Sequence, residues 1–244
     1  MKDERARIDR REVPRAGLAR RVAAGMLLGG MVFAFPDWTV GSDLPPGADA
    51  APQERGGDGR LDPPEVLVAR GRSLIQVGDW PRAIEAFRSA LARDPRNVDA
   101  LYGLGLTYGV RKEYENAIAV YREMQRLAPD DERSYVNLAQ LYAQLSEFPE
   151  EIAQYERLLR LRPDRADARF LLGNAYLKVG RYADGIAAFR RTLALRPSFV
   201  PALYALSMAH LWAGDRARAR DVARELGQQD PDRARYLLNM IGPN

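Results

Sequence analysis

The stretch PRNVDALYGLGLTYGVRKEYENAIAVYREMQRLAP, residues 95–129, contains one full period of the pattern that decides the fold. Prolines recur at the same interval of 34 residues, at Pro95, Pro129, Pro163, Pro197 and Pro231. Two series of aromatic residues and one of leucines share this register. They are Trp80, Tyr114, Phe148 and Tyr182, then Phe87, Tyr121, Tyr155 and Phe189, then Leu104, Leu138, Leu172 and Leu206. Several residue types in one register indicate a tandem repeat of paired helices.

Each period contains two segments with the spacing of an amphipathic helix. In the quoted period, Leu101, Leu104 and Tyr108 share one face of a helix predicted over residues 100–110. A second helix is predicted over 115–127, with an apolar stripe of Ala117, Ile118, Tyr121 and Met124. Each repeat is therefore expected to fold as helix, turn, helix.

Prolines and polar residues also predict where these helices begin. Pro81 and Pro149 fit the first turn of a second helix, where the missing N–H group has no partner to lose. Four of the periodic prolines are followed directly by a short polar residue that suits the N-cap of the next repeat's first helix. These predicted N-caps are Asp130, Asp164, Ser198 and Asp232.

These motifs resemble the tetratricopeptide repeat (TPR) family. The family pattern has an apolar residue, Leu-Gly and Tyr in the first helix, then an aromatic residue, Ala, another aromatic residue and a closing Pro. The second repeat matches it with Leu101, Leu104-Gly105, Tyr108, Tyr114, Ala117, Tyr121 and Pro129. The fourth matches it with Leu172-Gly173, Tyr176, Tyr182, Phe189 and Pro197. The same scaffold serves many partners, so the resemblance specifies the fold more closely than the function.

The resemblance implies an all-α fold. The expected architecture is an α-solenoid, a right-handed superhelix of five 34-residue helix-turn-helix repeats over residues 64–233. Residues 234–244 are expected to form a short C-terminal capping helix and tail, in which Leu237 and Met240 cover the end of the last repeat.

Three further segments precede the repeats. Residues 1–21 form a basic N-terminal tail with eight Lys or Arg residues against four acidic ones. Residues 22–40 are largely apolar and are predicted to be a membrane anchor or a secretory signal. Residues 41–63 are rich in Gly, Pro, Asp and Ala, a composition that predicts a flexible linker.

Two interpretations of the apolar segment remain open, and both predict a protein of the bacterial cell envelope. A single uncleaved anchor agrees with the length and the acidic residues of the tail before it. Cleavage near Ala34 would instead export the repeats, since small residues precede that point. A buried N-terminal helix is a third alternative. The bacterial source is inferred from codon bias, because only three lysines accompany 34 arginines.

Composition excludes several kinds of chemistry. The chain has no cysteine, and its single histidine, His210, stands where earlier repeats have Tyr108, Tyr142 and Tyr176. We therefore interpret His210 as a packing residue, and we predict no catalytic, cofactor or metal site and no enzyme activity. Beyond residue 21 the basic and acidic residues balance, which gives no support for a nucleic-acid partner.

Two departures from the repeat pattern stand out. Glu151 occupies a position that other repeats fill with Ala83, Ala117, Gly185 or Ala219, so its carboxylate is expected to tilt outward or to shift its helix. The fifth repeat has Ser207, His210, Arg216 and Ala223 where the pattern has Gly, Tyr, an aromatic residue and Phe.

In the TPR family the first helices line a concave groove that holds a peptide or a partner helix. By helical phase, the residues predicted to bind a partner there are Tyr102, Leu106, Asn137, Gln140, Phe170, Asn174, Lys178, Tyr204, Met208 and Trp212. The carboxylate clamp of chaperone-binding members is not predicted, because Val68, Arg72 and Gly103 occupy its opening positions.

The predicted function is therefore a non-enzymatic scaffold. In layout the chain resembles bacterial anchored TPR proteins that assist the assembly of envelope complexes. The alternative is an accessory or substrate-recognition subunit of an enzyme complex, with the repeats as the recognition arm.

Overall fold

The computed structural model describes residues 62–243, and every regular element in this range is an α-helix. The basic tail 1–21, the apolar segment 22–40 and the linker 41–63 except its last two residues lie outside the described range. Within residues 62–243, no helix combines the length and the apolar character needed to cross a membrane.

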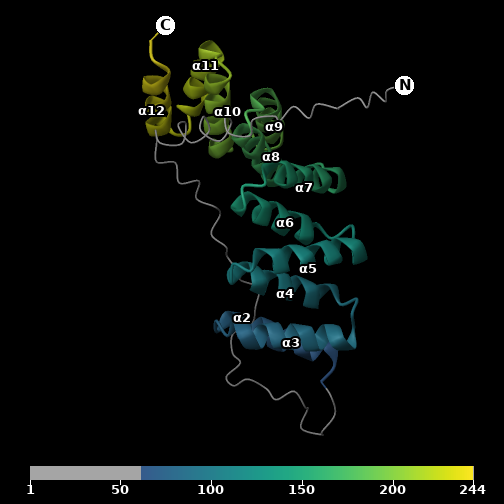
Figure 1. Ribbon diagram of the computed structural model, residues 1–244. Helices are drawn as coiled ribbons and strands as arrows, with labels where there is room; N and C mark the ends of the chain where they lie inside the picture. Colours follow the sequence, from purple (N-terminus) through teal and green to yellow (C-terminus); the bar gives the residue numbers. More distant parts are fainter. Residues whose placement is uncertain (1–61, 244) are drawn as a thin grey trace, which may run out of the picture. The chain divides into compact units, whose positions relative to one another are not determined.

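Eleven helices follow one another along the described part of the chain (Figure 1). They are α2 (Pro64–Gln76), α3 (Trp80–Arg93), α4 (Val98–Val110), α5 (Tyr114–Leu127), α6 (Glu132–Gln144), α7 (Phe148–Leu161), α8 (Ala166–Lys178), α9 (Tyr182–Leu195), α10 (Val200–Trp212), α11 (Arg216–Leu226) and α12 (Pro231–Ile241). Five consecutive pairs correspond to the five predicted repeats, and α12 follows them. The predicted helices at 100–110 and 115–127 are confirmed, with starts at Val98 and Tyr114.

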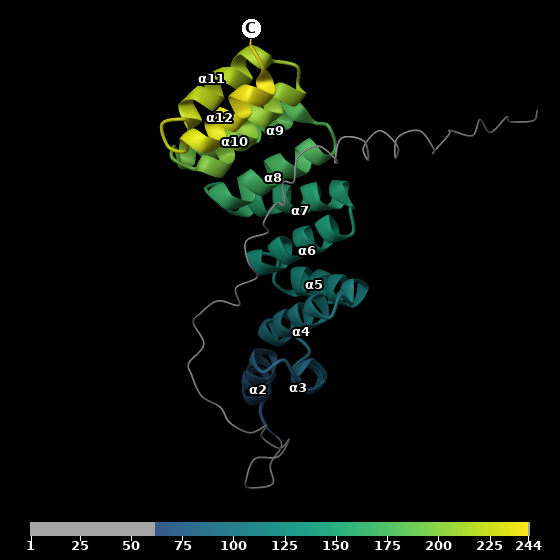
Figure 2. The same ribbon diagram turned by 90° about the vertical axis from the view of Figure 1, so that its left-hand side faces the viewer.

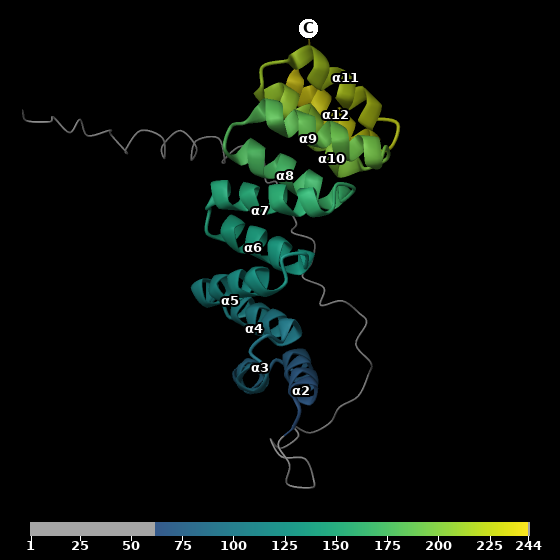
Figure 3. The same cartoon turned by 90° about the vertical axis from the view of Figure 1, so that its right-hand side faces the viewer.

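The helices stack in chain order, and Figures 2 and 3 show the same order from two other sides. Each helix packs against the next one in the sequence. First helices also contact one another across repeats, since α4 packs against α2 and α6, and α10 against α8 and α12. Second helices of the described repeats make no contact of similar extent with one another. The first helices therefore lie on the more closely packed face of an all-α solenoid, as predicted.

The packing depends on one aromatic ring per repeat. A Cβ atom added to Gly71 of α2 would lie 2.6 Å from the ring of Phe87, and one added to Gly103 of α4 would meet the same ring. The Phe87 ring of α3 thus touches the backbone of the first helix in its own repeat and in the next. Tyr121 approaches Gly105 in the same way, and the completely buried Phe189 approaches Gly173.

The prediction that the residue after each proline caps the next helix is wrong. The observed N-caps are Asn97, Asp131, Arg165 and Phe199, two positions after the proline. In each case the N–H of the N-cap residue donates to the carbonyl three residues earlier, at 3.1 Å from Asn97 to Asp94. The proline is therefore the second residue of a four-residue turn, and the residue after it is the third.

The turn inside each repeat contains one residue with left-handed backbone. The positive φ angles are 76° at Gly78, 61° at Lys112, 59° at Ser146, 76° at Gly180 and 84° at Gly214. These five positions are again 34 residues apart. Side chains at Lys112 and Ser146 are accepted there although the conformation costs a non-glycine residue about 1 kcal/mol or more.

The C-terminal helix differs from its prediction in two ways. It begins at Pro231 instead of Ala234, because the Asp230 side chain accepts the N–H of Arg233 and proline occupies the first turn. The expectation that Met240 covers the last repeat is wrong, since this side chain is 41% exposed. Leu237 and Ile241 are the buried residues, because they are four positions apart on one face of α12.

Replacing Gly105 by leucine should destabilise the protein by about 1–3 kcal/mol, because overpacking a close contact forces the Tyr121 ring or the helix to move. Denaturant unfolding of the full chain measures this change. Ala119→Leu, at an exposed position of α5, is the matched control and should leave the free energy of unfolding nearly unchanged. Equal stability of the two variants would contradict the close-contact interpretation.

Candidate partner-binding face

The ten predicted groove residues all belong to the first helices α4, α6, α8 and α10, but they differ in exposure. Asn137, Asn174, Tyr204 and Met208 are buried. Tyr102, Leu106, Gln140, Phe170 and Lys178 are half-buried, and Trp212 is 46% exposed. Only the last six therefore offer side-chain surface in this structure.

Tyr102 and Phe170 occupy equivalent positions in repeats two and four and are held by neighbouring rings and charges. The Tyr102 ring lies 6.4 Å from that of Tyr121, and the Arg133 guanidinium lies 4.7 Å from the Tyr102 ring centroid. The Phe170 ring lies 5.7 Å from Phe189 and 5.2 Å from Phe199, edge-on to the latter. Both rings therefore present one edge to the groove while they also pack between repeats.

Tyr204 and Met208 are covered by the C-terminal helix. Both belong to the apolar cluster that includes Leu237 and Ile241 of α12. Burial also raises the pKa of the Tyr204 hydroxyl. The sequence pattern placed these two residues on the groove correctly by helical phase, but α12 takes the space that a partner would need beside them.

Charged residues along the first turns of the first helices form ion pairs across repeats. Asp99 of α4 pairs with Arg72 of α2 at 3.1 Å and with Arg133 of α6 at 2.9 Å. Arg165, which precedes α8, pairs with Glu132 of α6 at 2.6 Å and with Asp167 of α8 at 2.7 Å. These side chains are all partly exposed, so each pair contributes only about 0–1 kcal/mol to stability. They neutralise most of the charge on this edge of the groove.

Glu151 does not tilt outward, and that expectation is wrong. The residue is only 3% exposed, and its carboxylate accepts hydrogen bonds from Lys178 Nζ at 3.0 and 3.2 Å. The Lys178 ammonium also lies 5.2 Å from the Phe148 ring centroid. Burial raises the pKa of the Glu151 carboxyl, and the nearby ammonium opposes that rise. A lysine on the next repeat's first helix therefore makes the buried carboxylate tolerable.

Buried amide groups gather near the same ion pair. The side chain of Gln125 donates to Gln154 Oε1 at 2.9 Å, and Asn137 donates to the Arg133 carbonyl at 2.7 Å. The Asn174 Oδ1 atom is buried and has no hydrogen-bond partner among the described residues. These groups lie in repeats three and four, where α6 and α8 do not make the extensive contact seen between α4 and α6.

A second periodic contact joins each second helix to the following repeat. Arg88 donates to the Tyr108 hydroxyl at 2.6 Å, and Arg122 donates to the Tyr142 hydroxyl at 2.8 Å. In the next repeat Glu156 replaces arginine and accepts from the Tyr176 hydroxyl at 2.7 Å. Burial and this hydrogen bond to Glu156 raise the pKa of Tyr176 to about 12.

His210 takes the tyrosine position in the fifth repeat and is buried, as its interpretation as a packing residue required. Burial lowers the pKa of its imidazole, and the charges of Arg190 and Arg218 lower it further, while Asp215 opposes them. Arg190 stands in the same column as Arg88, so a cation faces a neutral ring where earlier repeats have a hydroxyl acceptor.

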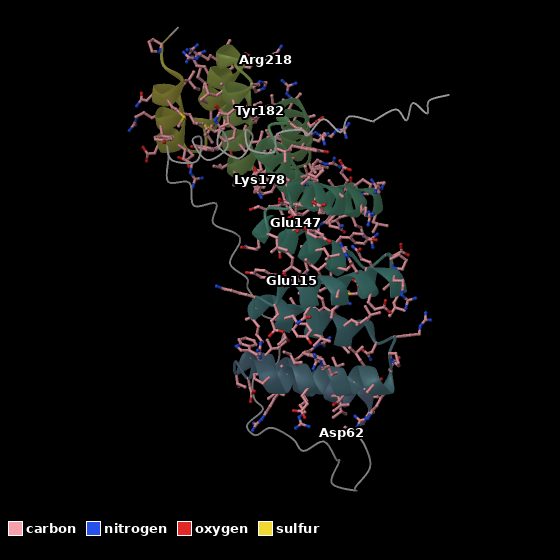
Figure 4. The ribbon with its side chains drawn as sticks, viewed as in Figure 1. Asp62, Glu115, Glu147, Lys178, Tyr182 and Arg218 are labelled. Atoms are coloured by element: carbon pink, nitrogen blue, oxygen red, sulfur yellow. The ribbon has the colours of Figure 1, made fainter. Side chains whose placement is uncertain are left out.

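Trp212 is the groove residue with the most open ring. It ends α10, and its ring lies 6.3 Å from that of Tyr182 at the start of α9. Figure 4 shows Lys178 and Tyr182 following Glu115 and Glu147 along the turns within successive repeats. Lys178 occupies the same position in repeat four as Trp212 in repeat five, 34 residues apart.

The described residues contain no group of three or more His, Asp or Glu side chains placed to hold a metal ion. Two open surface hollows lie away from the groove, one on α3 and one between α11 and α12. Stacked helix pairs with an extended, partly apolar face define a helical-repeat interaction protein.

Two tetratricopeptide repeat models match the sequence, one over residues 68–132 and 136–198 and the other over 177–240. The first alone covers more than half of the 244 residues. The chain therefore belongs to the tetratricopeptide repeat family, whose members are in general protein-interaction modules without catalytic activity.

Solved structures of TPR proteins are similar to the described part of the chain. A crystal structure of MamA is 26% identical, with a TM-score of 0.64 over 72% of this chain and 96% of that one. YrrB is 20% identical, with a TM-score of 0.61 over 70% and 89% of the two chains. A tetratricopeptide repeat protein from Parabacteroides merdae ATCC 43184 is 20% identical, with a TM-score of 0.65 over 73% of each chain.

The sequence prediction missed three features of this face. The ion-pair network was missed, although its signal was present, because Asp99, Arg133 and Asp167 alternate in sign at the repeat interval. The partnership of Glu151 with Lys178 was missed because the two residues are 27 positions apart in different repeats. The role of Tyr182 beneath Trp212 was missed because Tyr182 was assigned only to the repeat pattern.

The stability of the protein should fall as the pH decreases below about 6.5, because unfolding frees His210 to take up a proton near its ordinary pKa. The folded state holds the neutral ring, so the unfolded state binds more protons in this window. The contribution of one group has a slope of at most about 1.4 kcal/mol per pH unit. His210→Tyr should remove this contribution and give Arg190 a hydroxyl acceptor.

Urea unfolding of the wild type and His210→Tyr between pH 7.5 and 5.5 measures this difference directly. Carboxylates that titrate in both proteins cancel in the comparison. Parallel pH profiles for the two proteins would show that His210 does not carry the effect.

Proposed function

We propose that this protein is a non-enzymatic scaffold that binds a peptide or a partner helix along the face of its first helices. The observation that carries the proposal is the row of half-buried apolar and amide side chains on successive first helices. Tyr102, Leu106 and Gln140 are examples from repeats two and three, and Phe170 continues the row in repeat four. Apolar side chains left partly exposed on neighbouring elements are typical of interaction surfaces.

The chemistry of the row indicates the kind of segment that it fits. Ion pairs neutralise the charges at its edge, and the rings of Tyr102 and Phe170 are fixed by their neighbours before a partner arrives. Fixed aromatic side chains lose little conformational freedom on binding. The similar structure of YrrB is that of a TPR protein with an unusual peptide-binding site, which supports a peptide as one form of partner.

We also propose that residues 22–40 place this scaffold at a membrane of the bacterial cell envelope, where it assists the assembly of a protein complex. The support is the apolar composition of this segment and the basic residues before it. Either a single N-terminal anchor or export after cleavage near Ala34 satisfies this proposal.

To test the binding face, partners are captured from the native cell with the full chain, and the affinity of one captured partner is measured. Tyr102→Ala should weaken binding by about 1–3 kcal/mol, the range of interface hot spots. Glu115→Ala, at an exposed position on a second helix, is the matched control and should bind like the wild type.

Thermal unfolding of the same variants distinguishes binding from packing, because Tyr102 also contacts Tyr121. A Tyr102→Ala protein that is less stable, yet binds with unchanged affinity once folded, would contradict the groove assignment. Capture of an enzyme through the same face would favour the accessory-subunit alternative.

Fractionation of native cells tests the proposed location. An uncleaved anchor should keep the full chain with membranes after a high-salt wash, and cleavage should yield a mature N-terminus near Phe35. An intact N-terminus in the soluble cytosolic fraction would contradict both forms of the proposal.

A further inference from the structure

Of the four aromatic residues predicted for the groove, Trp212 alone has a ring that is largely open. Tyr102 is covered by the guanidinium of Arg133, Phe170 lies between two other phenylalanine rings, and Tyr204 is buried against α12. Trp212 is supported by Tyr182 at 6.3 Å and is 46% exposed. A ring held on one side and open on the other is the arrangement of an anchoring residue at an interface.

The equivalent positions in other repeats show that this arrangement is confined to the fifth. In repeat four the position is filled by Lys178, whose ammonium is already bound to Glu151 and lies near the Phe148 ring. Repeat three has Gln144 and repeat two has Val110, neither of which has an aromatic side chain. The open aromatic surface therefore lies at the junction of α9, α10 and α11.

This junction is also the most basic part of the repeat array. Residues 181–224 contain eight arginines and only three acidic residues, whereas residues 62–180 contain 17 basic and 18 acidic residues. Arg216 takes the position that aromatic residues fill in the first four repeats, and a turn of three residues separates it from Trp212. The Arg216 guanidinium has no ion-pair or hydrogen-bond partner among the described residues.

We infer that Trp212, Tyr182 and Arg216 form an anchoring subsite for an acidic, extended segment of a partner protein that carries an aromatic side chain. The inference rests on the proposed scaffold function and specifies the chemistry of its partner. The partner's ring packs on the open side of Trp212, and a neighbouring carboxylate pairs with Arg216, for which arginine provides a planar pair of donors.

A protein segment fits this surface better than an anionic membrane does. Asp184 and Asp215 lie beside the junction, each paired with an arginine at 2.7 and 3.2 Å respectively. A flat anionic bilayer would meet these carboxylates as well as the arginines, whereas an extended segment can place its carboxylate at Arg216 alone. The surrounding arginines would also increase the rate of association with an acidic segment.

A phage-displayed library of random dodecapeptides, selected on the full chain, tests the inference. The enriched peptides should share an aromatic residue flanked by Asp or Glu. An enriched peptide made synthetically should bind Trp212→Ala and Arg216→Glu about tenfold more weakly or worse. Higher salt should also weaken its binding to the wild type. Arg157→Glu, at an exposed position on α7, is the matched charge control and should leave affinity unchanged.

Circular dichroism melts of each variant establish that lost binding is not lost folding. Enriched peptides that lack acidic residues, or that bind Trp212→Ala as tightly as the wild type, overturn the inference. If such peptides instead depend on Tyr102, the scaffold function stands and only this subsite fails. Absence of any enriched peptide contradicts the scaffold's peptide-binding mode together with the subsite. Binding of anionic vesicles through Trp212, without peptide enrichment, would replace the protein partner by a membrane.

Discussion

The ring of Phe87 touches the backbone of two first helices at once, and the rest of the structure depends on this kind of contact. Because Gly71 and Gly103 have no side chains, the ring fills the space between α2 and α4. No repeat can bury its apolar stripes alone, so each ring belongs to the core of two repeats. The repeat interval in the sequence therefore reflects the distance along the chain between one ring and the next.

Polar contacts arranged on the same interval fix how neighbouring repeats are oriented. The bonds from Arg88 to Tyr108 and from Arg122 to Tyr142 connect the outer helix of one repeat with the inner helix of the next. Glu156 and Tyr176 keep the contact with donor and acceptor exchanged. The position tolerates either sign of charge because a tyrosine hydroxyl both donates and accepts. His210 lacks this property in its neutral, buried form, which makes the fifth repeat the exception.

Departures from the pattern concentrate in repeats three to five, which also contain the candidate binding features. Glu151 is buried against Lys178, an amide oxygen of Asn174 is left without a partner, and Trp212 is left open. Repeats that follow the pattern closely satisfy their polar groups and cover their rings. Where the pattern is broken, the side chains are available for contacts outside the array, which is the physical basis for placing partner recognition there.

The sequence by itself determined the number of repeats, the pairing of helices and the columns of residues that share a face, because these follow from local periodicity. It also identified Tyr102, Phe170 and Trp212 as residues of one face. Only the tertiary structure decided which of these rings is open, that Asp131 rather than Asp130 caps α6, and that Glu151 is buried. These outcomes depend on side chains about one repeat away in the sequence, such as Lys178 and the residues of α12. Helical phase states the direction in which a side chain points, whereas its exposure depends on what the neighbouring repeat places in front of it.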